Sequence, residues 1–591
     1  MELLAGIIAV VLSSIFPSLS EEAHPRLLLA KGEECRIVEA VGSSDYLRRV
    51  DSVVFSQAAE AVRTTPTEYR MTGRRLLDQS RRSLKRLFSL SYAYRFSGGR
   101  EYLLAAVSEL ESVCSFPDWN PSHYLDVAEM CLGVSIAYDW LYDSLSSDVR
   151  SLACEAIERL ALDTALDPAY DRFYNGVSNW LQVCNTGLVF GALAIADKAP
   201  DKAERIIRNY FDSIVRTVDS YDPDGAYPEG PMYWSYGTEF NTLLNYQLEK
   251  AGLKPYTGKG GFQRTGEYYL HSMGPSGLFF NYSDGGARCG ASVAEFYFAV
   301  VNDDPSLLWN TLRQPVPDSR LLPAALIFAS EIHSPRACEP ESLSWLGRGS
   351  VPVYYARTSW EDPDASFFGV KGGRSNHSHS HLDQGSFVFD ALGERWVVDL
   401  GNEDYTQVEK AGIDLWNMSQ TSQRWDLIAY DNMHHSTMTF DGRLQNVEGK
   451  CEVVREIKKR NWRGVLLDLS GCYDNVASAC REICLRKDGS LEIRDAVGTA
   501  DRPVRMDWNL MTGEDTDCVV MDSGEIALHR NGKTLVVSFH GPKGLKIESR
   551  VEKCVPKTSY ERIRAKRAGF TVWLPAGTDN DFKITLKPIR K

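Results

Sequence analysis

The spacing of apolar residues changes once along this chain of 591 residues, near residues 320–355. Before this region, several segments repeat apolar side chains with the 3.6-residue period of a helix. These segments are 82–96, 101–113, 124–145, 151–162, 179–196, 202–220 and 238–252. After Val351 the pattern becomes short alternating runs bounded by Gly, Asp and Asn, as in antiparallel strands. The runs are 386–389, 396–400, 466–470, 491–494, 534–539 and 570–574. The sequence predicts a multidomain α+β chain in which an α/α-barrel or toroid precedes an antiparallel β-sandwich.

Length also indicates more than one domain. A single hydrophobic core stops growing at about 250–300 residues, well below the length of this chain. We predict a toroid domain over residues 21–335 and a β-sandwich domain over residues 336–591. The net charge of −13 argues against a nucleic-acid partner, so an anionic ligand must be met by a local basic groove.

The first 20 residues have the pattern of a signal peptide. An apolar run from Leu3 to Phe16 precedes small residues and the acidic pair Glu21-Glu22. The usual basic residue before the run is missing, since the first Lys or Arg is Arg26. We predict a signal peptide over 1–20 and a periplasmic or secreted protein. No later segment is long and apolar enough to predict a membrane span.

Histidines gather in the segment Asn376-His-Ser-His-Ser-His-Leu-Asp383. If this segment is extended, its two-residue period places His377, His379, His381 and Asp383 on one face. Imidazole and carboxylate groups together suit Zn²⁺ or a general acid/base site. A single histidine here would be read as a loop residue on a β-domain surface, but a cluster favours a functional site.

Two later stretches add groups to this cluster. Residues 384–401 read as a β-hairpin around Ala391-Leu-Gly-Glu394, and its return strand carries Asp399. A further strand-like run begins at His434-His435. His381, Asp399 and His435 would make a set of two imidazoles and one carboxylate. Asp383 is an alternative to Asp399, and His434 is an alternative to His435, because neighbouring residues on a strand face opposite ways.

The helical half contains two stretches whose side chains are not required for packing. In the first, Asn179-Trp180 opens an apolar helix, where Asn179 is either the N-cap or a functional amide. The second runs from Asp222 to Thr238 and reads as a polar aromatic loop that carries Glu229, Tyr233 and Tyr236. Such a loop suits either a ligand-stacking wall or a plug at a domain interface.

Taken in order, these pieces resemble the heparinase II/III-like polysaccharide lyases. The resemblance rests on His24-Pro-Arg-Leu-Leu-Leu29, Asn179-Trp180, the Asp224-Gly to Tyr236-Gly stretch, the block from His379 to Phe387, Asp399-Leu-Gly401 and His435-Ser-Thr437. It covers essentially the whole chain after residue 23, and the histidine block is its specific element. It implies an N-terminal incomplete (α/α) toroid followed by an antiparallel β-sandwich region, in agreement with the periodicity.

The resemblance implies β-elimination on a polysaccharide that contains uronic acid, which leaves a 4,5-unsaturated uronosyl end. The C5 proton is weakly acidic, so such an enzyme must neutralise the carboxylate, remove the proton and protonate the departing O4. By resemblance, Asn179 would bind the carboxylate, Tyr236 would be the catalytic acid and His379 the catalytic histidine. Tyr233 is the alternative to Tyr236, and Arg374 is a candidate to lower the pKa of the phenol.

The resemblance also implies a zinc ion held by His381, Asp399 and His435. Such a metal would be structural and would orient the neighbouring histidine. Some alginate-cleaving relatives have a histidine where this chain has Trp180, and His123 is a candidate to replace it. The predicted substrate-binding residues are therefore His123, Trp180, Glu229, Tyr233 and Arg374.

The sequence is compatible with several functions. The resemblance favours exolytic action on heparin or heparan sulfate, with alginate as the nearest alternative. A glycoside hydrolase of the α/α-toroid type would need two carboxylates, such as Asp126 and Glu229. A catalytically silent glycan-binding protein is the third class. In each case the partner is an anionic polysaccharide or oligosaccharide, and a homodimer is one option for the assembly.

Overall fold

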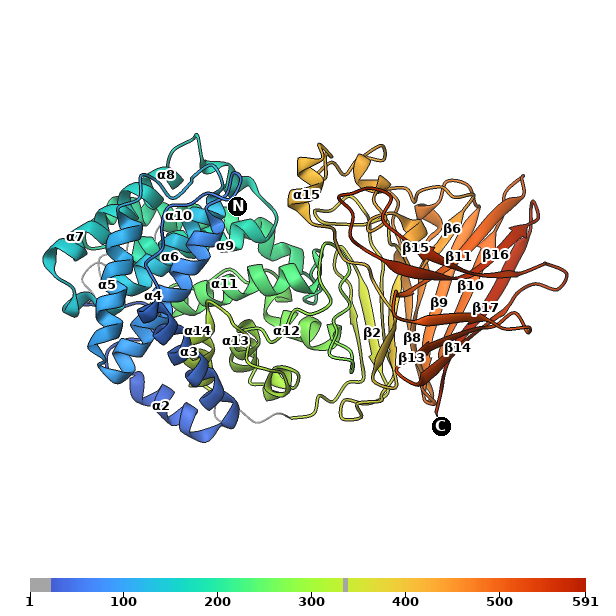
Figure 1. Ribbon diagram of the computed structural model, residues 1–591, viewed down its shortest axis with the longest axis horizontal. Coiled ribbons are helices and arrows are strands. Elements are labelled where there is room, and N and C mark those ends of the chain that lie inside the picture. The colour runs from blue at the N-terminus through green and yellow to red at the C-terminus, as the bar shows by residue number, and fades with distance from the viewer. Residues whose placement is uncertain (1–22, 333–337, 591) are drawn as a thin grey trace. The chain divides into compact units, whose positions relative to one another are not determined.

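The computed structural model describes residues 23–332 and 338–590, which form two compact units (Figure 1). The first unit holds the described residues up to Ser220 together with Ser235–Gly266 and Gly290–Cys338. The second holds Tyr221–Trp234, Glu267–Cys289 and the chain from Glu339 onward. Two segments from the helical half of the sequence thus belong to the second unit. The predicted signal peptide lies outside the described residues.

The first unit is helical, as the apolar period predicts. Its helices are α2 (Glu34–Ser43), α3 (Asp45–Arg63), α4 (Leu77–Ser97), α5 (Arg100–Cys114), α6 (Tyr124–Trp140), α7 (Ser147–Ala156), α8 (Asp163–Ala165), α9 (Asn179–Ala194), α10 (Pro200–Val218), α13 (Ala294–Val301) and α14 (Leu322–Ala329). Two more, α11 (Gly230–Lys250) and α12 (Gly261–Ser272), each contribute residues to both units. The sequence places the start of α11 too late, so Tyr233 and Tyr236 lie on a helix and not in a loop.

The helices α6 and α9 are buried on all sides. Every residue of α6 is buried, and so is nearly every residue of α9. A Cβ at Gly187 would lie 2.1 Å from the carbonyl oxygen of Ala128, so only glycine allows α9 to approach α6 this closely. The sequence predicts these segments as amphipathic, but central helices need no polar face. The outer helix α10 does follow the expected pattern, with Ile206, Ile207 and Tyr210 on its buried face.

The second unit contains three antiparallel sheets. The five-stranded sheet has the order β1 (Ser344–Gly347), β2 (Val353–Arg357), β3 (Phe367–Lys371), β4 (Phe387–Ala391), β5 (Glu394–Val397). The eight-stranded sheet has the order β12 (Asp517–Val520), β13 (Ile526–Arg530), β14 (Lys533–His540), β17 (Asp579–Ile589), β10 (Leu491–Gly498), β9 (Ser478–Arg486), β8 (Trp462–Asp468), β7 (Glu452–Lys459). The four-stranded sheet has the order β15 (Glu548–Cys554), β16 (Ala565–Leu574), β11 (Val504–Gly513), β6 (Met438–Phe440). The predicted hairpin at residues 384–401 is β4 and β5, which turn at Leu392 and Gly393, both with positive φ.

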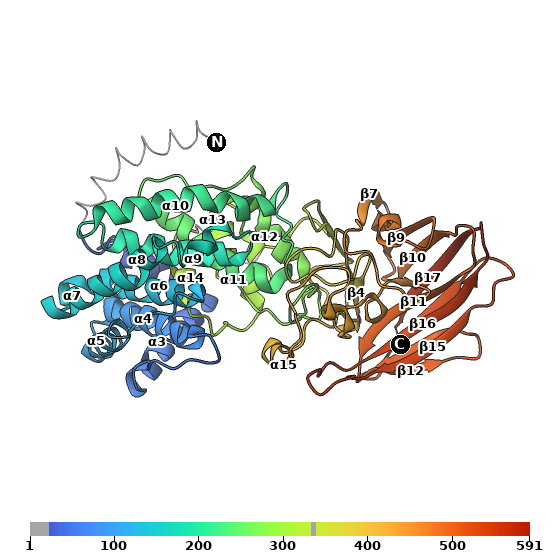
Figure 2. The ribbon, with the colours of Figure 1, turned by 90° about the horizontal axis from the view of Figure 1, so that it is seen from above.

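The strands of the eight-stranded and four-stranded sheets lie close together within the second unit (Figure 2). Aromatic side chains fill the space between these two sheets. Trp508 of β11 stacks on Phe570 of β16 with ring centroids 5.9 Å apart. Phe570 in turn contacts Phe539 of β14 and Phe582 of β17 at 5.0 and 5.7 Å. The two sheets therefore pack face to face, and the predicted fold class is confirmed. A short helix, α15 (Tyr405–Lys410), lies in the long connection between β5 and β6.

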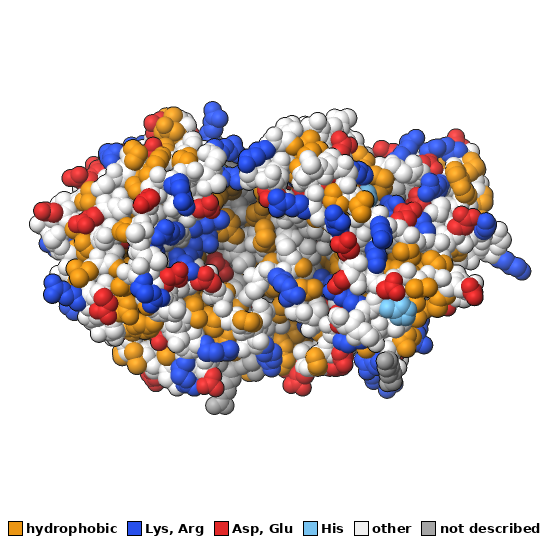
Figure 3. All heavy atoms as spheres, viewed as in Figure 1, with side chains coloured by type: hydrophobic (Ala, Val, Ile, Leu, Met, Phe, Trp, Pro, Cys, Tyr) orange, Lys and Arg blue, Asp and Glu red, His pale blue; other side chains and the backbone are white. Residues whose placement is uncertain are grey.

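On the face drawn in Figure 3, lysine and arginine side chains are interspersed with aspartate and glutamate. Among the helices that the structure describes, none is long and apolar enough to cross a membrane.

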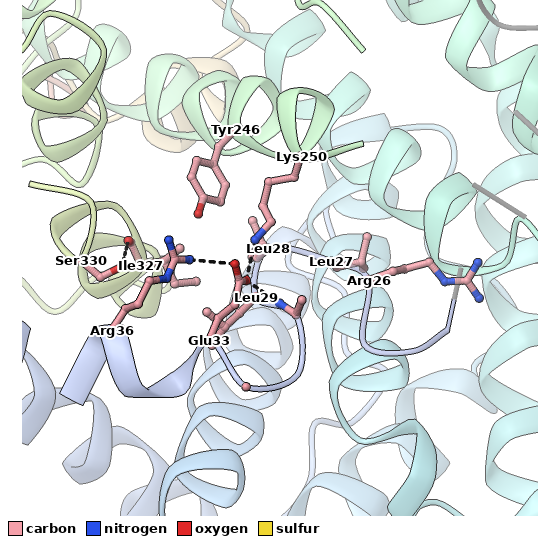
Figure 4. A network of polar contacts seen from close by, with 12 residues as sticks. Arg26, Leu27, Leu28, Leu29, Glu33, Arg36, Tyr246, Lys250, Ile327 and Ser330 are labelled. Carbon is pink, nitrogen blue, oxygen red and sulfur yellow. Dashed lines mark hydrogen bonds and ion pairs between the residues drawn. The ribbon is translucent and has the colours of Figure 1, made fainter. Parts of the chain in front are cut away.

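The His24–Leu29 motif anchors the start of the described chain within the first unit. The backbone N–H groups of Arg26 and Leu27 donate to the buried carboxylate of Asp139 at 2.8–3.0 Å. A few residues later, Glu33 accepts hydrogen bonds from Arg36 and Lys250 at 3.0 and 2.6 Å (Figure 4). This part of the motif is therefore structural, because its groups are used to hold the chain against α6 and α11.

Candidate active site

Tyr233, His379 and Tyr405 form an aromatic cluster in the second unit. The rings of Tyr233 and His379 stack with their centroids 4.0 Å apart and 19° between their planes. The hydroxyl groups of Tyr233 and Tyr405 lie 2.9 Å apart, and the Tyr405 hydroxyl lies 3.3 Å from Nδ1 of His379. A proton can therefore pass between two phenols and an imidazole without a large movement.

The buried carboxylate of Asp284 contacts His379 and fixes the position of this cluster. This carboxylate lies 3.0 Å from Nδ1 of His379 and 2.9 Å from Nε2 of His381, and it accepts a 2.7 Å hydrogen bond from Arg424. Burial alone would raise the pKa of Asp284, but the charge of Arg424 and the two histidine contacts hold it well below its ordinary value. Asp284 is therefore a fixed anion that orients two histidines at once.

The histidine segment is not extended, so the prediction that His377, His379, His381 and Asp383 share one face is wrong. Residues 377–379 form a turn in which the N–H of Ser380 donates to the carbonyl of His377. His379 has φ of +62°, which is uncommon for a residue with a side chain. The turn directs both His379 and His381 toward Asp284, an outcome that a two-residue period does not predict.

Four side chains near His381 each have one buried atom without a hydrogen-bond partner. These atoms are Nδ1 of His381, Oδ2 of Asp383, Oδ2 of Asp399 and Nδ1 of His435. Ligand atoms of His381, Asp383 and His435 all lie within 4.8 Å of one another, and Asp399 Oδ2 lies 3.5 Å from His435 Nδ1. Buried polar atoms normally find partners, so four such atoms gathered together fit a bound cation.

The second polar atom of each of these side chains already has a hydrogen-bond partner. Nε2 of His381 faces Asp284, and Nε2 of His435 lies 3.1 Å from the carbonyl of Ala429. Lys371 donates to Asp383, and the N–H of Gly401 donates to Asp399. This arrangement leaves two imidazole nitrogens and two carboxylate oxygens for a metal, a donor set that suits zinc.

The sequence leaves two choices of metal ligand open: Asp383 or Asp399 as the carboxylate, and His434 or His435 as the second histidine. Asp383 belongs with His381 and His435 to the group whose ligand atoms lie within 4.8 Å of one another, whereas Asp399 adjoins this group through its 3.5 Å contact with His435. His434 instead lies 2.7 Å from Asp431, with its Nδ1 engaged there, and only His435 faces the group.

Tyr236 belongs to a separate network in the first unit. Its hydroxyl donates to the buried carboxylate of Glu129 at 2.8 Å, and Arg81 and Arg320 also bond to that carboxylate. The two guanidinium groups lie 5.1 and 5.3 Å from the centre of the Tyr236 ring. Burial and the charge of Glu129 raise the pKa of Tyr236 despite the two nearby arginines.

The first unit also brings Asn179 and Trp180 close to this network. A Cβ at Gly237, the residue after Tyr236, would lie 2.9 Å from Cβ of Asn179, so α9 and α11 touch here. Trp180 meets the ring of His123 edge-on with centroids 4.7 Å apart. Asn179 is the first residue of α9 and Ser178 is the N-cap, so Asn179 does not cap the helix.

A family model described as "Heparinase II/III-like, C-terminal" matches residues 359–572, which include the His379 turn and the candidate metal group. This part of the chain is similar to the C-terminal domain of heparinase II/III-like proteins. The resemblance seen in the sequence is thereby confirmed. None of the curated proteins compared with the chain matches it.

Solved structures share the fold over most of the chain. A crystal structure of heparinase III has a TM-score of 0.60 at 13% identity and covers 91% of this chain and 85% of its own. The heparan sulfate lyase HepC from Pedobacter heparinus has a TM-score of 0.59 at 12% identity, with 99% and 88% covered. The chondroitin AC lyase from Streptomyces coelicolor A3, solved with chondroitin sulphate, has a TM-score of 0.53 at 15% identity, with 94% and 83% covered.

Two further residues that the sequence predicts to bind substrate, Glu229 and Arg374, also have identified contacts. Glu229 is buried and accepts a 2.8 Å hydrogen bond from the hydroxyl of Tyr227. Arg374 is exposed, with Glu448 as its ion-pair partner at 3.9 Å. The cations beside Tyr236 are Arg81 and Arg320, two arginines that sequence reasoning missed.

Sequence reasoning also missed Asp284, Tyr405 and Glu129. Asp284 lies in Asn281-Tyr-Ser-Asp-Gly-Gly286, where an aspartate before two glycines reads as an ordinary turn. Tyr405 follows the block Asp399-Leu-Gly401 by only a few residues, and its closeness to a conspicuous motif was the available signal. Glu129 stands in an apolar helix, and a carboxylate in such a helix indicates a buried partner.

Proposed function

We propose that this protein is a polysaccharide lyase that cleaves a uronic-acid-containing polysaccharide by β-elimination, with heparin or heparan sulfate as the favoured substrate. The observation that carries the proposal is the cluster of Tyr233, Tyr405 and His379 on Asp284, within a chain that shares its fold with polysaccharide lyases. Alginate remains the alternative substrate. Exolytic action and export from the cytoplasm stay predictions of the sequence.

The cluster supplies the groups that β-elimination needs. Burial and the charge of Asp284 raise the pKa of Tyr233, so its phenol is protonated at rest. A protonated phenol donates to the departing O4 oxygen and then recovers its proton. In the proposed step, Nε2 of His379 accepts the C5 proton as Tyr233 protonates the departing O4. Nδ1 of His379 then returns a proton through the Tyr405 hydroxyl to the Tyr233 phenolate.

This assignment prefers Tyr233 to Tyr236 as the acid. Tyr233 stacks on His379, whereas Tyr236 donates to Glu129 and is enclosed by two arginines. Asn179 keeps the role that the resemblance gives it, as the amide that binds the uronate carboxylate. In that role its N–H groups would stabilise the negative charge that develops as the C5 proton leaves.

A metal on His381, Asp383, Asp399 and His435 would be structural in this scheme. When bound, it would supply a fixed cross-link among three loops. Because His381 also contacts Asp284, that cross-link would restrict the movement of the Asp284 carboxylate, which orients His379. The reaction itself consumes no water, so the chain's own phenols and imidazole carry every proton step.

Ultraviolet absorbance of the unsaturated uronate product tests the proposal. The purified protein and its His379→Ala variant are compared on heparin, heparan sulfate, chondroitin, hyaluronan and alginate. We expect absorbance to rise on at least one polymer with the wild type and to stay flat with the variant. New reducing ends without absorbance would indicate hydrolysis and contradict the proposal. Binding without turnover on all five polymers would favour a silent glycan-binding protein.

A further inference from the structure

The loop between α3 and α4 carries a group of arginines with no ion-pair partner among the described residues. Arg70 and Arg74 are exposed and Arg75 is half-buried. Glu68 is the one acidic residue between Thr64 and Leu76. In contrast, Arg81, Lys85 and Arg86 on the following helix each pair with a carboxylate. The loop is therefore a local site of uncompensated positive charge on a chain whose net charge is −13.

The backbone of this loop is fixed. Thr72 and Arg75 exchange two hydrogen bonds of 2.8 and 3.1 Å, which close a tight turn. The side chain of Asn120 donates to the carbonyl of Arg74 at 2.9 Å, and the N–H of Leu76 donates to Asp126 at 2.6 Å. A loop with a fixed backbone loses less conformational entropy when it binds an anion.

The same contacts connect the loop to residues that the sequence assigns to substrate binding. Asp126 holds Leu76 with one oxygen and faces Nδ1 of His123 at 2.6 Å with the other. His123 meets Trp180, which follows Asn179 in α9. In addition, Nε of Arg75 is buried and has no hydrogen-bond partner. The loop is thus linked to Trp180 by three successive contacts, through Asp126 and His123, all within the first unit.

We propose that Arg70, Arg74 and Arg75 bind a sulfate group of the substrate and so select a sulfated uronic-acid polysaccharide. This inference rests on the proposed function. The carboxylate of the reacting uronate is assigned to Asn179, so the loop must serve a different anion. Guanidinium groups bind oxyanions with two parallel hydrogen bonds, which suits sulfate. Alginate and hyaluronan carry further carboxylates but no sulfate, so a loop that requires sulfate would discriminate against both polymers.

The test removes the three charges and compares substrates with and without sulfate. One variant carries Arg70→Gln, Arg74→Gln and Arg75→Gln. The control carries Arg100→Gln, Arg159→Gln and Arg205→Gln, which removes the same charge from exposed arginines of the same unit. Elimination rates are measured on a size-defined heparan sulfate oligosaccharide and on its chemically desulfated counterpart. We expect the loop variant to raise KM for the sulfated substrate about tenfold or more, with KM for the desulfated one unchanged. The control should change neither.

Calorimetric binding of the same two oligosaccharides separates this inference from the proposed function. Sulfate-dependent affinity that is lost in the loop variant and kept in the control supports the inference, even if no elimination occurs. Equal affinity of the loop variant and the wild type for the sulfated oligosaccharide overturns it. Elimination with no preference for the sulfated substrate also overturns it, and leaves the lyase proposal intact.

Discussion

At the scale of single residues, the site depends on one strained histidine and one buried aspartate. His379 adopts a left-handed backbone conformation, which costs about 1–3 kcal/mol and persists only where the surroundings enforce it. Asp284 provides that enforcement, because its carboxylate contacts His379, His381 and Arg424 together. Strain of this kind is found at catalytic and ligand-binding sites, where it fixes a side chain in its working orientation.

Replacement of Asp284 tests this arrangement. Asp284→Asn should abolish elimination and destabilise the protein by about 3–5 kcal/mol, because it leaves the fully buried Arg424 without its counter-charge. Asp426→Asn is the matched control, since Asp426 is an exposed carboxylate two residues from Arg424. Thermal unfolding and product absorbance measure the two effects. An Asp284→Asn protein with wild-type stability would show that the buried pair is not essential to the fold.

How much of the site can be predicted from sequence differs from residue to residue. His379, His381, Asp399 and His435 stand out because histidines and carboxylates at close spacing are rare without a function. Asp284 cannot be found in this way, because it lies 95 residues before His379 and is brought to it only by folding. Arg424 is closer in sequence, but an arginine by itself is usually a surface residue and gives no signal of a site. The choice between Tyr233 and Tyr236 also depends on three-dimensional contacts, since both stand in the same motif.

At the scale of elements, the candidate metal group ties three connections of the second unit together. His381 and Asp383 follow β3, Asp399 follows β5, and His435 precedes β6. These connections have little regular structure, so a shared ion would replace the hydrogen bonds that strands provide. The sequence predicts the strands on either side but not the connections, because irregular backbone leaves no periodic signal.

We expect the purified protein to contain about one equivalent of zinc by elemental analysis, and His435→Ala to contain almost none. Loss of the ion should lower the melting temperature of the variant and of chelator-treated wild type alike. His434→Ala is the control, because His434 faces Asp431 and should leave the metal content unchanged. Equal melting temperatures with and without zinc would contradict a structural role.

A buried carboxylate in α13 gives the first unit a pH-dependent stability. Burial raises the pKa of Glu295 to about 8, with a further increase from the nearby Glu239, against an ordinary value of 4.5. The folded protein therefore keeps this proton to higher pH than the unfolded chain does. The associated stability is present at low pH and is lost as pH rises through 8.

Glu295→Gln should remove this dependence. Relative to the variant, the wild type should lose melting temperature steadily between pH 5 and about 9, which corresponds to roughly a few kcal/mol in the free energy of unfolding. Glu111→Gln, at an exposed position on α5, should run parallel to the wild type. A constant difference between wild type and Glu295→Gln at all pH values would show that Glu295 ionises normally.

At the scale of the whole molecule, the order of helices and then sheets follows directly from the sequence. Periodicity finds the helices that line a core, and alternation finds the strands that pack in the sandwich. Periodicity also finds α6 and α9 but does not show that they are buried all round, and it misses the first turns of α11, whose tyrosines resemble a polar loop. It also cannot show that Tyr221–Trp234 and Glu267–Cys289 join the second unit, since such contacts are set by folding alone.

The most direct test of the account compares Tyr233→Phe with Tyr236→Phe on heparan sulfate, with the ultraviolet absorbance of the unsaturated product as the readout. Each variant removes one hydroxyl from α11 and leaves the ring in place. We predict that Tyr233→Phe lowers kcat by about 10²–10⁴-fold. Tyr236→Phe should act mainly on stability, because it takes one donor from the buried Glu129. Wild-type turnover by Tyr233→Phe, on a polymer that the wild type cleaves by elimination, would show that Tyr233 is not the catalytic acid.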